Sequence, residues 1–208
     1  MNQRFHPIFT IGHSLHTPDR FCQLIIRNEI EVVLDVRSSP YSRRAPHFNR
    51  SAIEPMLRSV GVRYSFAGHT LGGRPENSAL YVGSQASYKL MAASESFTTS
   101  LRKVARGAKS AIVALLCAEA DPIECHRFLL ISRALHARGF DVKHILANGL
   151  TESHTDGERR MLVATDLSQG DVFAPSEDAL ALAYERQAAR YAFVKPAPTY
   201  RPHGLESA

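Results

Sequence analysis

The stretch SAIVALLCAEADPIECHRFLLISRAL, residues 110–135, decides the fold of this chain. Its first eight residues, 110–117, are almost all apolar and do not alternate with polar residues, which is typical of a strand covered on both faces of a parallel sheet. Asp121, Pro122 and Glu124 follow in the pattern of a capping box, so we expect a helix to begin there. A strand followed at once by a helix predicts an α/β protein with this strand at the centre of its sheet.

Strands and helices alternate along the rest of the chain. Residues 7–12 and 31–37 read as parallel strands joined by a helix that Thr17 caps, which makes a βαβ unit. We therefore expect a three-layer α/β fold with a mostly parallel sheet, helices on both faces and a C-terminal helical extension. Further predicted segments are a capping box at 51–54 that begins a helix ending near Gly61, a strand at 62–66, a loop at 67–86, one or two helices over 87–106, a last strand at 141–146, and helices near 156–166 and 176–192.

The composition indicates a globular chain with one main domain. The 208 residues are 44% hydrophobic and 22% charged, enough to bury a full core. We expect residues 1–148 to form the α/β domain, residues 149–195 a helical extension packed on it, and the proline-rich residues 196–208 a disordered tail. No apolar run approaches the roughly 20 residues of a transmembrane helix, so we expect no membrane partner. Three cysteines, an odd number, fit a cytoplasmic protein with reduced thiols.

Arginine supplies most of the formal net charge of +5. Guanidinium groups suit phosphates and carboxylates, so a small anionic ligand, a nucleotide or a nucleic acid is one interpretation of this charge. A genome that favours arginine explains the same charge without any partner. The sequence identifies no cofactor and leaves the oligomeric state open.

Chemically active side chains gather where the predicted strands end. In an open α/β sheet, ligands bind beyond the carboxyl ends of the strands. Three pairs lie at or just beyond those ends: His13 and Ser14, Asp35 and Arg37, Cys117 and Glu119. Asp35 and Arg37 point to the same face of their strand. The ion pairs we expect there are Arg37 with Glu119 or Asp35 with Arg127, because charges at the end of an apolar strand need partners.

Five motifs in a fixed order resemble one family. They are TIGHS (10–14), DVRSSPYSRR (35–44), LGGR (71–74), LLCAE…CHR (115–127) and HIL (144–146). Together they are similar to a bacterial and archaeal family known as domain of unknown function 488, over roughly residues 5–148. The resemblance implies an α/β domain, singles out Cys117 and Cys125, and implies no settled activity. The two glycines of LGGR favour a tight turn, although they would also let the backbone approach a ligand.

The leading functional hypothesis is a thiol-dependent enzyme. If Asp121 caps the helix, Cys125 lies in its first turn, where the helix dipole favours a thiolate. Cys125 or Cys117 would then be the nucleophile or redox group, and Glu119 or His13 would transfer protons. The residues expected to hold or surround a small anionic or nucleotide-like substrate are Arg37, Arg127, Asp35, Tyr41, Arg43, Arg44, His126 and Ser14. The competing interpretation is that the cysteines only fill space where helix meets sheet.

A nucleic-acid-binding module is the alternative. The loop 37–50 interleaves arginines, among them Arg43 and Arg44, with the aromatic residues Tyr41 and Phe48. Charge for phosphates and rings for bases are what single-stranded nucleic acid needs. A surface loop in an arginine-rich protein is also basic by chance, so both interpretations stay open.

A metal-binding protein is the weaker alternative. Cys117, Cys125, His126 and His13 are ligand types that zinc and iron accept, and all four can lie at one edge of the sheet. The Cys-x7-Cys-His spacing is wider than the two to four residues that usually separate zinc ligands in short motifs. No metal ligand is therefore assigned from the sequence.

Overall fold

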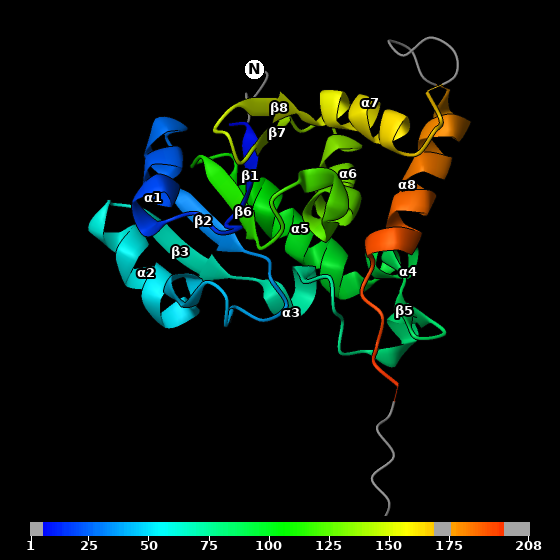
Figure 1. Cartoon of the computed structure of the whole chain (residues 1–208), viewed down its shortest axis with the longest axis horizontal. Helices are drawn as coiled ribbons and strands as arrows, with labels where there is room; N and C mark the ends of the chain where they lie inside the picture. Colours follow the sequence, from blue (N-terminus) through cyan, green and yellow to red (C-terminus); the bar gives the residue numbers. More distant parts are fainter. Residues whose placement is uncertain (1–5, 169–175, 198–208) are drawn as a thin grey trace, which may run out of the picture.

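A six-stranded sheet forms the centre of the protein (Figure 1). The computed structural model describes residues 6–168 and 176–197. The strand order is β3–β2–β6–β1–β7–β8; the first five run parallel, and β8 is antiparallel to β7. The strands are β1 (Ile8–Gly12), β2 (Val32–Asp35), β3 (Arg63–Phe66), β6 (Val113–Cys117), β7 (Val142–Ile145) and β8 (Thr151–Ser153). The predicted α/β class and the central place of residues 110–117 are confirmed, because β6 lies between β2 and β1 and is buried throughout.

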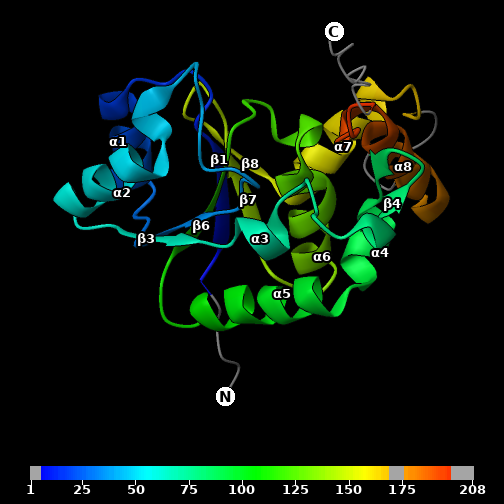
Figure 2. The same ribbon diagram turned by 90° about the horizontal axis from the view of Figure 1, so that it is seen from below.

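Helices cover both faces of the sheet (Figure 2). On one face, α1 (Pro18–Arg27) and α2 (Arg50–Ser59) bury apolar side chains at helical spacing: Phe21, Leu24, Ile25, Ile53 and Leu57. The second face is covered by α3 (Gly68–Leu71), α4 (Tyr88–Ala93), α5 (Glu95–Gly107), the π-helical turn η4 (Arg127–Ser132), α6 (Arg133–His136), α7 (His154–Ala164) and α8 (Glu177–Tyr191). Thr17 caps α1 as predicted, since its hydroxyl accepts from the backbone N–H of Arg20 at 3.2 Å.

The predictions for residues 51–54 and for residues 67–86 are wrong. The helix α2 begins at Arg50, not with a capping box at 51–54, because the Glu54 carboxylate pairs with Arg58 at 3.2 Å instead of a backbone donor. The segment 67–86 is more than a loop: it holds α3, the 3-10 turn η2 (Ser78–Leu80) and the hairpin of β4 (Tyr81–Val82) and β5 (Gln85–Ala86). The strand predicted at 141–146 forms as β7, but it is not the last strand, because β8 follows it in the chain and pairs with it.

The turn after β6 also differs from the prediction. Asp121 does act as a cap, since Oδ1 accepts from the Ile123 N–H at 3.1 Å. The turn that follows is a single 3-10 turn, η3 (Pro122–Glu124), because the Glu124 carboxylate accepts from the Tyr191 hydroxyl at 2.7 Å and does not close a capping box. Cys125 is extended, at φ −132° and ψ 144°, and therefore precedes the helix rather than lying in its first turn.

The C-terminal helices hold this turn in place. Arg160 of α7 binds Asp121 at 2.7 Å, and Gln187 of α8 donates to the Ile123 carbonyl at 3.0 Å. Most of the predicted tail, residues 196–208, lies outside the described residues. Within the described ranges, none of the helices has the length and apolar character to cross a membrane.

Candidate metal centre

The loops that follow β1, β2 and β6 meet at the carboxyl edge of the sheet. Gly12 pairs with Cys117 in the strand register, so the residues after both strands start side by side. A Cβ atom on Gly12 would lie 1.7 Å from the Glu119 carbonyl oxygen, and the position therefore requires glycine. The loop from β6 can in this way fold across the end of β1 and bring Glu119 back toward Cys117.

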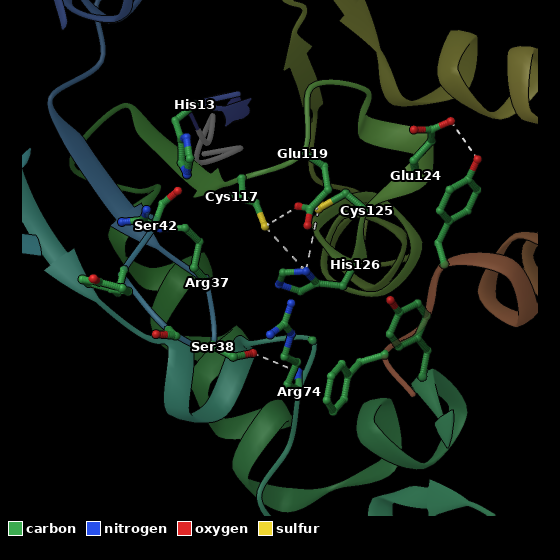
Figure 3. Close-up of a pocket in the computed structure, with 17 residues that line it drawn as sticks. His13, Arg37, Ser38, Ser42, Arg74, Cys117, Glu119, Glu124, Cys125 and His126 are labelled. Carbon is green, nitrogen blue, oxygen red and sulfur yellow. Dashed lines mark hydrogen bonds between the residues drawn. The ribbon is translucent and has the colours of Figure 1, made fainter. Parts of the chain in front are cut away.

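Four side chains converge in this loop (Figure 3). Ligand atoms of Cys117, Glu119, Cys125 and His126 all lie within 4.8 Å of one another. The Glu119 carboxylate oxygen Oε2 lies 2.8 Å from the sulfur of Cys117 and 2.9 Å from the sulfur of Cys125. The His126 Nδ1 atom lies 3.7 Å from each sulfur. Both cysteines are free thiols, and His13 lies outside this group of four.

The orientation of His126 is fixed by its second ring nitrogen. Nε2 lies 3.0 Å from the Val36 carbonyl oxygen, which can only accept, so Nε2 carries hydrogen. In the neutral ring, Nδ1 therefore directs a lone pair at the two sulfurs. Gly73 packs against the other side of the ring, where a Cβ would come within 2.9 Å of Cγ. The glycine pair of LGGR thus serves close packing, because neither Gly72 nor Gly73 has a positive φ.

The four groups influence one another's protonation. Burial raises the pKa of Cys117, and its contact with the neighbouring Cys125 thiolate raises it further. Burial acts the same way on Cys125, but the hydrogen bond from Cys117 and the charge of Arg127 outweigh it and lower the pKa to about 6. For Glu119, the two thiol hydrogen bonds outweigh the effect of burial and lower the pKa to about 2. The pKa shifts therefore favour the charged forms of Cys125 and Glu119 and the neutral thiol of Cys117.

The Arg127 side chain stabilises the loop after β6 by binding its backbone. Its side chain is fully buried, with Nη1 donating to the Glu119 carbonyl at 2.7 Å and Nη2 to the Ala120 carbonyl at 3.1 Å. Its backbone N–H reaches the Cys125 sulfur at 3.4 Å. Arg127 is not among the residues that line the pocket described below, and the anion-binding role predicted for it stays a prediction. The predicted Asp35–Arg127 pair is wrong, because Asp35 pairs with Arg37 and the Arg127 guanidinium binds two backbone carbonyls.

Arg37 pairs with Asp35, not with Glu119 as predicted. The Arg37 Nη2 atom lies 2.6 Å from Asp35 Oδ2 and also donates to the Phe48 carbonyl at 2.9 Å. The Tyr64 hydroxyl donates to the same Asp35 oxygen at 2.8 Å. Asp35 is completely buried, so it fixes the Arg37 guanidinium from the interior of the protein.

His13 lies beside Arg37 at the end of β1. Its Nδ1 atom donates to the Ser14 carbonyl at 2.9 Å, and its ring stacks on Phe48 with centroids 4.6 Å apart. Burial is the largest influence on the ring and lowers the pKa of His13 to about 4. His13 is therefore neutral near pH 7.

A pocket of about 340 Å³ opens beside the cluster. The predicted site residues that line it are His13, Arg37, Tyr41, Cys117, Glu119, Cys125 and His126. Ser14, Arg43 and Arg44 are outside the lining, and both arginines are exposed. The lining residues that the sequence interpretation did not single out include Ser38, Ser42, Arg74, Tyr191 and Phe193. Arg74 belongs to LGGR, which could have drawn attention to it, whereas the two C-terminal aromatics carry no local signal.

One family model matches the chain. Residues 17–134, more than half of the chain, match the family described as Domain of unknown function DUF488. This range contains the cluster and Arg37 but not His13 or the HIL motif, which belong to the wider resemblance over residues 5–148. Comparison with curated proteins and with solved structures finds no match.

Proposed function

The chain belongs to the DUF488 family, and we propose that it is a zinc-dependent enzyme that holds the ion on Cys117, Cys125 and His126. The observation that carries the proposal is the orientation of His126: its Nδ1 atom lies 3.7 Å from the sulfurs of Cys117 and Cys125 while Nε2 donates to the Val36 carbonyl. Metal-binding histidines are held in this way by a second partner on the far ring nitrogen.

The spacing of the ligand atoms supports this assignment. A tetrahedral zinc ion, with bonds of about 2.3 Å to sulfur and about 2.05 Å to nitrogen, separates those two atoms by about 3.6 Å. The His126 Nδ1 atom lies 3.7 Å from both the Cys117 and the Cys125 sulfur. Both sulfur–nitrogen distances therefore fit zinc ligation, and the three ligand atoms lie within 4.8 Å of one another. Two thiolates and an imidazole are also a soft donor set that suits zinc.

Glu119 has a different role from the three ligands. Its distances to the two sulfurs, 2.8 and 2.9 Å, are those of thiol hydrogen bonds and are shorter than the separation of about 3.5 Å between two zinc ligands. Zinc with three protein ligands supplies an acidified water at its fourth position. The Glu119 carboxylate, within 2.9 Å of both cysteine sulfurs, would be the nearest proton acceptor for such a water. This arrangement supports metal-assisted hydrolysis of a small substrate.

Zinc titration of the full-length chain after chelation tests the proposal. We expect one ion per chain, and cobalt in its place should give the absorption bands of thiolate ligation. Cys117→Ser and Cys125→Ser should each weaken binding beyond the roughly 10–100-fold that changes outside the first coordination sphere produce. Cys22→Ser is the matched control, because Cys22 is a free cysteine on α1 outside the cluster. Equal zinc affinity in all three variants would overturn the proposal.

A thiol nucleophile is the second candidate, and one contact favours it. The Cys125 sulfur accepts the Arg127 N–H at the start of the helical segment, an arrangement that stabilises a thiolate. The two candidates differ in how alkylation responds to zinc. If zinc is the resident ion, it protects Cys117 and Cys125 from iodoacetamide while Cys22 still reacts. If Cys125 is the nucleophile, it is alkylated first, with or without added zinc.

A further inference from the structure

One wall of the pocket holds two buried polar atoms that lack a partner. Arg37 and His13 are 4% and 3% exposed, yet Arg37 Nη1 and His13 Nε2 have no hydrogen-bond partner. Both residues line the pocket, on the side opposite Glu119 and Cys125 (Figure 3). A buried donor or acceptor without a partner destabilises the fold, and more so when the group is charged. These two atoms therefore mark a place that a polar group of a ligand would complete.

We propose that this wall binds the phosphate group of a small ligand, and that this ligand is the substrate class of the neighbouring metal centre. The substrate assignment rests on the proposed function, whereas phosphate binding rests on the wall alone. The pocket volume of about 340 Å³ limits the ligand to a small molecule.

The fixed orientation of the Arg37 guanidinium leaves one nitrogen for the ligand, and from this we expect phosphate to bind better than carboxylate. Its Nε and Nη2 atoms are occupied by Asp35 and by the Phe48 carbonyl, which hold the guanidinium plane in one orientation. A planar carboxylate prefers two parallel bonds from one guanidinium, and only Nη1 is left. A tetrahedral phosphate can take a single bond from Arg37 and use its other oxygens elsewhere.

The remaining donors lie along the same wall. The Ser38 hydroxyl oxygen accepts the Arg74 backbone N–H at 2.8 Å, and the Ser42 hydroxyl oxygen accepts the Ala45 N–H at 3.1 Å. Each hydroxyl therefore keeps its own hydrogen for a ligand. The Arg74 guanidinium lies over the Phe193 ring at 4.8 Å and adds a second positive charge at the pocket. The His13 Nε2 atom is an acceptor in the neutral ring, because Nδ1 donates to the Ser14 carbonyl, so it would accept the hydrogen of a singly protonated phosphate.

The experiment measures binding of inorganic phosphate to the full-length chain by calorimetry, both as purified and zinc-loaded. We expect one saturable site in both forms. Arg37→Lys should weaken binding at least tenfold, since lysine keeps a charge for Asp35 but cannot also present a fixed second donor to the pocket. The exposed pair Arg43→Ala with Arg44→Ala should leave the affinity unchanged, because neither residue lines the pocket. Acetate should compete weakly with phosphate.

A second variant keeps the proposal testable if Arg37→Lys does not fold. Arg74 is exposed, so Arg74→Gln should fold normally and weaken phosphate binding severalfold. Phosphate affinity that is equal in wild type, Arg37→Lys and Arg74→Gln would overturn the phosphate proposal, as would acetate binding as tightly as phosphate. Loss of binding only in the Arg43 and Arg44 double variant would assign phosphate recognition to these two exposed arginines and overturn the proposal. Phosphate binding without zinc stoichiometry would refute the metal proposal alone.

Discussion

The Nε2 atom of His126 lies 3.0 Å from the carbonyl oxygen of Val36, the residue that follows β2. This bond joins two neighbouring strands of the sheet, because His126 belongs to the segment after β6 and Val36 continues β2. It sets the tautomer of the ring, and through it the direction of the Nδ1 lone pair toward the two thiols. The backbone of the sheet therefore fixes the ring of His126 in the proposed metal centre.

Gly73→Ala should loosen the metal centre without removing a ligand. The new Cβ would approach His126 Cγ to 2.9 Å and displace the ring. We expect a drop in zinc affinity of about 10–100-fold, the size found when an outer partner of a ligand is lost. Gly107→Ala is the control, since its Cβ would meet Val113 at an ordinary 3.9 Å. Unchanged zinc affinity in Gly73→Ala would show that the ring position does not matter.

Glu119→Gln should retain zinc. The amide cannot accept a proton as the carboxylate does, but the three ligands are untouched, so we expect one ion per chain and loss of hydrolytic turnover. Metal analysis after dialysis measures this directly. If Glu119→Gln loses zinc as completely as Cys117→Ser, Glu119 is a ligand and its role as proton acceptor is wrong.

Arg127→Met should destabilise the whole chain. Its two guanidinium bonds to the Glu119 and Ala120 carbonyls would be lost in a buried setting. Hydrogen bonds to charged groups contribute roughly 1.5–3 kcal/mol each, so the free energy of unfolding should fall by several kcal/mol. Chemical denaturation measures the change, with the exposed Arg43→Met as control. A variant as stable as wild type would show that these two hydrogen bonds contribute nothing to the free energy of unfolding.

Two buried imidazoles predict sensitivity to acid. His144 and His154 are joined at 3.1 Å, and the Tyr184 hydroxyl lies 2.9 Å from His154. Burial first, and then the charges of His136 and Arg133, lower the pKa of His154 from 6.5 to about 3. Between those two values the unfolded chain binds a proton that the folded chain does not, so stability decreases as the pH falls through this window.

The variant His154→Gln removes this titration and keeps a polar partner for its neighbours. Its melting temperature should fall less steeply than that of wild type between about pH 6.5 and pH 4. His69→Gln, at an exposed position, should keep the wild-type slope. Identical slopes for wild type and His154→Gln would mean that other groups govern acid unfolding.

Local patterns predicted the fold because each depends on neighbouring residues alone. The Thr17 cap and the apolar run of β6 are of this kind. The capping boxes failed because each glutamate found a partner elsewhere: Glu54 pairs with Arg58, and Glu124 with Tyr191, a residue 67 positions away in the chain. Sequence spacing cannot show such competition.

The candidate site could be predicted in part, because the ends of the strands can be located from the local sequence. The carboxyl-edge rule placed His13, Arg37 and Cys117 together. The metal set could not be assigned, because the Cys-x7-Cys-His spacing becomes compact only when the turn η3 folds Cys125 and His126 back toward Cys117. The Arg37–Asp35 pair was not predicted, because it depends on the Arg37 side chain turning back onto its own strand, where the Phe48 carbonyl also holds it.

X-ray absorption at the zinc edge of the zinc-loaded full-length chain tests the central claim most directly. The metal centre described above predicts two sulfur neighbours at about 2.3 Å and nitrogen or oxygen neighbours at about 2.0 Å, with one ion per chain. Loss of one sulfur neighbour in Cys125→Ser would complete the assignment. A shell of nitrogen and oxygen alone, or no bound zinc, would contradict it.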